Sequence, residues 1–132
     1  MLSALLAGRG LTSAASRRGR PPIVVHGVAT APELAYRDQF ERLSRDGTIH
    51  YVPAISRPTD PANRGWRGRV GRLDSLIAPI AADAGLEPAA TVAYLCGNPA
   101  MVAAVERQLA ILAIQDSAIR AERYWTAPIT GT

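Results

Sequence analysis

A strand, a tight turn and a helix follow one another in Thr91-Val92-Ala93-Tyr94-Leu95-Cys96-Gly97-Asn98-Pro99-Ala100-Met101. The first six residues are mainly apolar and rich in strand-forming types, which indicates a buried strand. Gly97 and Asn98 are turn residues, and Pro99 suits the first position of a helix. The apolar positions of that helix are Met101, Val102, Val105 and Leu109. This unit is typical of proteins that alternate strands with helices.

The same alternation extends to both sides of this stretch. Further strands are predicted over 23–26, 49–55 and 119–125, and further helices over 31–46 and 73–85. A polar segment over 59–71 is predicted to be a loop, residues 1–20 a basic helix or loop, and 126–132 a loose tail. We therefore expect a single α/β domain over 1–132, with an open parallel sheet of four to five strands and helices on both faces.

Composition excludes several classes of protein. The 132 residues include one cysteine and two histidines far apart in the sequence, which exclude an internal disulfide and argue against a zinc site. No apolar run is long enough to cross a membrane. We therefore expect a reduced, metal-free, cytoplasmic protein. A basic, serine-containing stretch over 1–20 leaves an organellar transit peptide as the alternative.

Arginine supplies every basic side chain, and the net charge is +4. Guanidinium groups bind phosphates through a planar, bidentate fork, whereas a basic chain can also bind nucleic acid. The arginines gather in the loop over 57–72 and aromatic residues are scarce, which disfavours a nucleic-acid module. A phosphate-bearing small molecule is the better expectation.

Three predicted strand ends carry polar or turn residues: His26-Gly27, Ser56-Arg57 and Cys96-Gly97-Asn98. Parallel strands place their carboxyl ends at one edge of the sheet, where ligands of open α/β folds bind. We therefore expect a binding site at this edge. The Gly-x-Gly-x-x-Gly fingerprint of many dinucleotide sites is absent from the sequence.

The chain resembles the NADP-binding domain of bacterial ferredoxin (flavodoxin)–NADP reductases over about residues 22–125. The turn Leu95-Cys96-Gly97-Asn98-Pro99-Ala100-Met101 resembles the family's C-G-N-P-x-M signature. Five further segments resemble the family in the same order: His26-Gly27-Val28, Glu33-Leu34-Ala35-Tyr36, Ile55-Ser56-Arg57, Gly68-Arg69-Val70 and Ala121-Glu122-Arg123-Tyr124-Trp125.

This resemblance implies an oxidoreductase part that binds NADP(H) and aligns nicotinamide with FAD, with ferredoxin or flavodoxin as the electron partner. Arg57 and Arg69 would face the 2′-phosphate, and Arg67 and Arg72 are close enough to replace Arg69. Catalytic roles near the nicotinamide are expected for Cys96 and Glu122. The expected cofactor-binding residues are His26, Gly27, Val28, Ser56, Arg57, Arg69, Cys96, Gly97, Asn98, Met101, Tyr124 and Trp125.

The chain also departs from the family. Its FAD-binding barrel and its Gly-Thr-Gly-x-Ala-Pro phosphate loop have no counterpart here, and Ala29 stands where many relatives have arginine. We therefore expect an N-terminally truncated, incomplete enzyme that retains no FAD and is inactive alone. The alternatives are the NAD(P)-binding half of another flavin reductase, such as a dioxygenase reductase, or a non-catalytic basic binding module.

Overall fold

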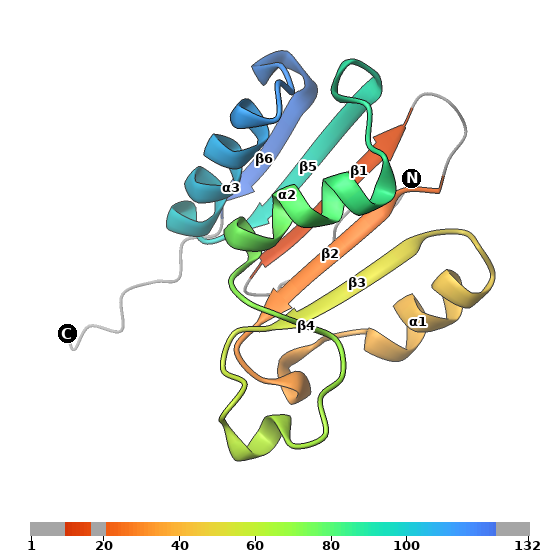
Figure 1. Ribbon diagram of the computed structural model, residues 1–132, viewed down its shortest axis with the longest axis vertical. Coiled ribbons are helices and arrows are strands. Elements are labelled where there is room, and N and C mark those ends of the chain that lie inside the picture. Colours follow the sequence, from red (N-terminus) through yellow and green to blue (C-terminus); the bar gives the residue numbers. More distant parts are fainter. Residues whose placement is uncertain (1–9, 17–20, 124–132) are drawn as a thin grey trace.

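The computed structural model describes the backbone of residues 10–16 and all atoms of residues 21–123. One sheet runs through this part of the chain, in the strand order β4-β3-β2-β1-β5-β6 (Figure 1). The strands are β1 Gly10–Ser16, β2 Ile23–Val28, β3 His50–Ile55, β4 Arg69–Val70, β5 Thr91–Gly97 and β6 Ile119–Arg123. The α/β class and the alternation of strands with helices are thereby confirmed.

The prediction of a parallel sheet with four to five strands is wrong in two respects, the number of strands and the direction of one of them. The described sheet has six strands, and β1 pairs antiparallel with β2 on one side and with β5 on the other. The segment Gly10–Ser16 was expected to be helix or loop, because its small and polar residues show no apolar alternation. Pairing along both of its edges, rather than intrinsic propensity, makes this segment a strand.

In the described part of the chain three α-helices cover the sheet: α1 Arg37–Arg45, α2 Leu73–Ala84 and α3 Pro99–Ile111. Four short 3₁₀ turns join the elements: η1 Ala31–Glu33, η2 Pro61–Asn63, η3 Pro88–Ala90 and η4 Asp116–Ala118. Among the described residues, no helix combines the length and the apolar character that a membrane span requires.

The helix expected over 31–46 is interrupted near its start. Glu33 closes η1 by accepting hydrogen bonds at Oε1 from the Thr30 amide at 3.0 Å and the Thr30 hydroxyl at 2.9 Å. Tyr36 adopts a left-handed backbone with φ 59°, which turns the chain before α1 begins. The sequence carries no signal of this break, because a change from a 3₁₀ turn to an α-helix leaves no periodic pattern of its own.

Successive strand residues face opposite sides of the sheet. Val25, Val52 and Leu95 pack under α2 and α3, while Val24, Tyr51 and Cys96 form a second cluster with Phe40 of α1. The helices thus lie on both faces of the sheet, as expected, with α2 and α3 together on one side (Figure 1). This arrangement leaves the carboxyl edge between the faces open for a ligand.

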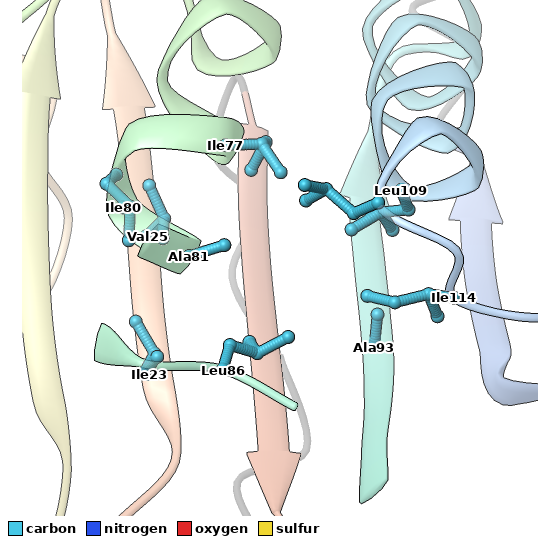
Figure 2. A pocket seen from close by; sticks show the side chains of 10 residues that line it. Ile23, Val25, Ile77, Ile80, Ala81, Leu86, Ala93, Leu109 and Ile114 are labelled. Atoms are coloured by element: carbon cyan, nitrogen blue, oxygen red, sulfur yellow. The ribbon is translucent and has the colours of Figure 1, made fainter. Parts of the chain in front are cut away.

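A cavity of about 30 Å³ remains between α2, α3 and the sheet. Figure 2 shows side chains from both helices and from β2 and β5 around it, including Ile77, Leu109, Val25 and Ala93. Its lining is apolar, so it offers no partner to a polar ligand. We therefore treat it as an imperfection of packing, separate from the polar carboxyl edge.

Candidate functional site

A polar hollow of about 400 Å³ lies at the carboxyl edge of the sheet. Segments after β2 and β3 form one side of it, and the first residues of α2 and α3 form the other. The lining residues are Gly27, Val28, Ala29, Ser56, Arg57, Gly71, Arg72, Leu73, Asp74, Asn98 and Met101. The structure thus brings together six of the expected cofactor-binding residues: Gly27, Val28, Ser56, Arg57, Asn98 and Met101.

Ser56 and Arg57 follow β3 directly and are both exposed. Their backbone continues the pairing with the β2 side, because the Ser56 amide donates to the Val28 carbonyl at 2.9 Å and the Arg57 amide to the Ala29 carbonyl at 3.3 Å. The hydroxyl and the guanidinium therefore start from a fixed backbone at the rim of the hollow. Both groups are suited to hydrogen bonds with a phosphate.

The second arginine at the hollow is Arg72 rather than Arg69. Arg69 lies in β4 and donates from Nη2 to Asp83 at 2.6 Å, outside the residues that line the hollow. Arg72 precedes α2 and lines the hollow, with its Nε 3.6 Å from Asp74 Oδ1. Arg67 is exposed in the loop and does not line the hollow. Of the three candidates for a second phosphate contact, the geometry favours Arg72.

Gly71 joins this arginine to β4 with a backbone φ of 146°, a conformation that side chains of L-residues rarely adopt. A Cβ at this position would stand 3.2 Å from Ser75 Oγ and 3.3 Å from Leu76 Cδ2. The glycine therefore permits the close turn that brings Arg72 and the start of α2 to the hollow.

Asn98 is the N-cap of α3, and its Oδ1 accepts a hydrogen bond from the Met101 amide at 2.8 Å. Pro99 follows at the first helical position, as the sequence predicted. The positive end of the α3 dipole therefore borders the hollow, as does that of α2. Both ends favour a negatively charged ligand.

His26 and Cys96 lie away from the hollow, on the α1 face of the sheet. Cys96 is 2% exposed and packs with Val24, Phe40 and Tyr51. His26 is fully buried, with Nδ1 3.3 Å from the Tyr51 hydroxyl. Burial lowers the pKa of His26 to about 4 and raises that of Tyr51. Neither side chain therefore lines the hollow.

Of the remaining expected residues, Gly97 and Glu122 lie near the end of the sheet. Gly97 ends β5 with φ 157°, and Arg123 pairs with it in the parallel register of β6. Glu122 is exposed and pairs with Cys96 in the same register. Tyr124 and Trp125 fall outside the described residues. Roles for these residues near a nicotinamide stay predictions.

Sequence reasoning missed Asn63, Gly71 and Asp74. Asp74 lies at the start of the helix expected over 73–85, but its place at the hollow depends on how the loop over 59–71 folds. Asn63 is 3% exposed and bonded to three backbone groups. The Asp60-Pro61 pair that opens its 3₁₀ turn was the available signal, because such pairs start turns.

An open sheet with a polar hollow beyond the ends of its parallel strands has the arrangement in which α/β folds bind their ligands. Residues 9–107 match the oxidoreductase NAD-binding domain family, and the chain belongs to that family. It is similar to XylA, the electron transfer component of xylene/toluene monooxygenase from Pseudomonas putida. The two are 25% identical over 115 residues, which make up 86% of this chain and 31% of XylA.

Two solved structures share the fold. One is a ferredoxin NADP+ reductase from Neisseria gonorrhoeae with bound FAD and NADP, and the other is the Amycolatopsis cytochrome P450 reductase GcoB. Each has a TM-score of 0.60 and 24% identity over 76% of this chain, and the matched parts are 43% and 28% of those chains. The expected ferredoxin reductase-type fold is confirmed, and the chain spans less than half the length of these relatives.

Proposed function

We propose that this chain binds NADP(H) at the carboxyl edge of its sheet, as the nucleotide part of a ferredoxin- or flavodoxin–NADP reductase-type oxidoreductase. The hollow of about 400 Å³ carries the proposal, because it joins Ser56 and Arg57 to Arg72 and to two helix N-termini. This donor set suits a phosphorylated dinucleotide: guanidinium groups and a hydroxyl for the 2′-phosphate, and backbone amides for further negative charge.

A bound nucleotide would supply hydride transfer between its nicotinamide and an FAD on a separate domain, and that FAD would exchange single electrons with ferredoxin or flavodoxin. The residues of this chain bind and orient the nucleotide. Arg57 and Arg72 hold the phosphate end, while Gly97 permits close approach of the other end to the backbone. Glu122, Tyr124 and Trp125 are the residues that we propose near the nicotinamide, whereas the Cys96 side chain is buried against α1 and is not included. On this proposal the chain alone retains no FAD and does not turn over.

Asp74 supports a second candidate function, in which NAD(H) is the nucleotide. Its carboxylate lines the same hollow, and carboxylates accept hydrogen bonds from the ribose hydroxyls of NAD. In that case the Arg72–Asp74 pair, at 3.6 Å, would keep the arginine from binding a 2′-phosphate. The chain would then be the nucleotide part of a different flavin reductase.

Calorimetric titration of the full chain with NADP+ and NAD+ separates the two candidates. We expect tighter binding of NADP+, and a loss of about tenfold to a hundredfold for NADP+ in Arg57→Ala, as for removal of one charged contact. Arg72→Ala should act in the same direction, whereas Arg69→Ala should have little effect. The control is Arg107→Ala, because Arg107 is exposed on α3 outside the hollow.

Absence of NADP+ binding, or equal binding by wild type and Arg57→Ala, would remove the proposed site. Tighter binding of NAD+ than of NADP+, with a loss in Asp74→Asn, would support the second candidate.

A further inference from the structure

Asn63 is a buried polar side chain at the junction between the end of β2, the end of β3 and the loop that follows β3. It ends the short turn η2 and is 3% exposed. A buried amide is costly unless its donors and its acceptor find partners. The partners of Asn63 therefore indicate what the side chain does.

All three partners are backbone groups. Asn63 Oδ1 accepts from the Ala31 amide at 2.7 Å, and Nδ2 donates to the Arg57 carbonyl at 2.7 Å and to the Ala29 carbonyl at 3.1 Å. This orientation of the amide is the one that the partners allow, because a backbone N–H only donates and a carbonyl only accepts. Both Nδ2 hydrogens are used.

Two of these partners, Ala29 and Arg57, line the hollow. They are also bonded to each other, because the Arg57 amide donates to the Ala29 carbonyl at 3.3 Å. Asn63 thus closes a small ring of hydrogen bonds across the carboxyl ends of β2 and β3. The backbone from which the Arg57 side chain projects is held from both sides.

The far part of the same loop has its own attachment. Trp66 Nε1 donates to the Arg69 carbonyl at 2.9 Å, and the Arg37 guanidinium lies 5.2 Å from the centre of the Trp66 ring. Removal of the Asn63 amide would therefore loosen the segment at Arg57 while Trp66 still holds the rest of the loop. The effect should be local.

We propose that Asn63 is a positioning residue, which fixes the backbone at Arg57 and so directs the Arg57 guanidinium toward the nucleotide phosphate. The inference rests on the proposed function, because it assigns Arg57 to that phosphate. Preorganisation of this kind strengthens binding by reducing the conformational freedom that the ligand must otherwise remove.

The test compares two probes on the full chain, 2′,5′-ADP and 5′-AMP, which differ by the 2′-phosphate. We expect Asn63→Ala to weaken binding of 2′,5′-ADP by about tenfold, the value of one or two hydrogen bonds, and to leave binding of 5′-AMP unchanged. In the Arg57→Ala background, Asn63→Ala should have no further effect on either probe. Asn63→Ser, which keeps one donor, should give an intermediate loss and serves if Asn63→Ala does not fold.

Thr91→Val is the matched control, because it also removes a buried hydrogen bond to the backbone. The Thr91 hydroxyl donates to the Glu87 carbonyl at 2.6 Å, at the start of β5 and so at the opposite edge of the sheet. This variant should lower stability without changing the ratio of the two affinities. A merely structural role for Asn63 would give the same result as Thr91→Val.

Three results would overturn the inference: unchanged 2′,5′-ADP binding in folded Asn63→Ala, an equal loss for both probes, or a loss that adds to that of Arg57→Ala. A wild-type chain that binds neither probe would instead overturn the proposed function. In that case hydrogen exchange of the Arg57 amide tests the positioning role separately. Asn63→Ala should speed the exchange of this amide, and unchanged exchange would contradict the inference.

Discussion

His26 occupies a fully buried position on β2, where a neutral imidazole fits and a charged one does not. Its Nε2 has no hydrogen-bonding partner among the described residues, and its ring meets Phe40 edge-on at 6.2 Å. Phe40 in turn stacks on Tyr51 at 5.0 Å. The packing of α1 on the sheet therefore depends on a titratable side chain.

We predict that stability falls between pH 6.5 and pH 4 because of His26. Burial lowers its folded pKa from 6.5 to about 4, so the unfolded chain binds the proton first as the pH falls. The stability that comes from keeping His26 neutral in the folded state is fully present above pH 6.5, and about 3 kcal/mol of it is lost by pH 4. Urea unfolding of wild type and His26→Phe at several pH values measures the difference between them.

His50→Gln is the control, because His50 is exposed at the start of β3. This variant should follow the pH dependence of wild type. If His26→Phe and wild type lose stability equally over this pH range, the buried histidine is not the cause.

At this scale the structure brings some of the expected site residues to the hollow and places others elsewhere. Arg57 was found because it follows a strand, and the ends of parallel strands share an edge. Arg69 was expected instead of Arg72 because Gly68-Arg69-Val70 resembles a family segment, and the loop over 59–71 has no periodicity from which its path can be read. Cys96 faces α1 because strand residues alternate, and the parity of β5 is set only when its neighbours pair.

The helix α3 shows how one residue serves both an element and the site. Asn98 caps its first turn through the Met101 amide, and the same residue lines the hollow. Sequence alone indicated the turn and the start of this helix, because Asn-Pro is a strong signal of a helix start. That Asn98 also lines the hollow could be seen only in the structure, because segments far apart in the sequence form the hollow.

We predict that two substitutions of Asn98 separate these roles. Asn98→Ala should lower the free energy of unfolding by about 1 kcal/mol, since it removes the cap. Asn98→Asp keeps a capping oxygen and should preserve stability, yet its negative charge should weaken binding of 2′,5′-ADP. Thermal unfolding and calorimetry on both variants check this, and a fully stable Asn98→Ala would show that the cap is dispensable.

At the scale of the whole molecule, β1 connects the two halves of the described sheet. The strands β4, β3 and β2 lie on one side of it, and β5 and β6 on the other. The sequence predicted β2, β3, β5 and β6, whereas β4 lies in the segment over 59–71 that was expected to be a loop. It did not predict β1, whose place depends on two partners far away along the chain.

We predict that Ser13→Pro destabilises the protein by about 3 kcal/mol or more, because proline breaks the pairing of a central strand. Ser13 pairs with Val24 of β2 and with Tyr94 of β5. Ser13→Ala keeps the backbone amide and should unfold in urea at nearly the wild-type concentration. Wild-type stability of Ser13→Pro would mean that β1 does not hold the sheet together.

The direction of β1 also has a practical consequence. Because it runs against its neighbours, Gly10 lies beside Gly97, and Arg123 lies on the other side of Gly97. Gly10 and Arg123, the first and last described residues, therefore flank Gly97 at the edge that we propose for the nucleotide. A dye attached at either of these two residues would stand beside that edge and disturb a binding assay. The turn at Asp46 and Gly47, on the opposite edge before β3, is the better point for surface attachment.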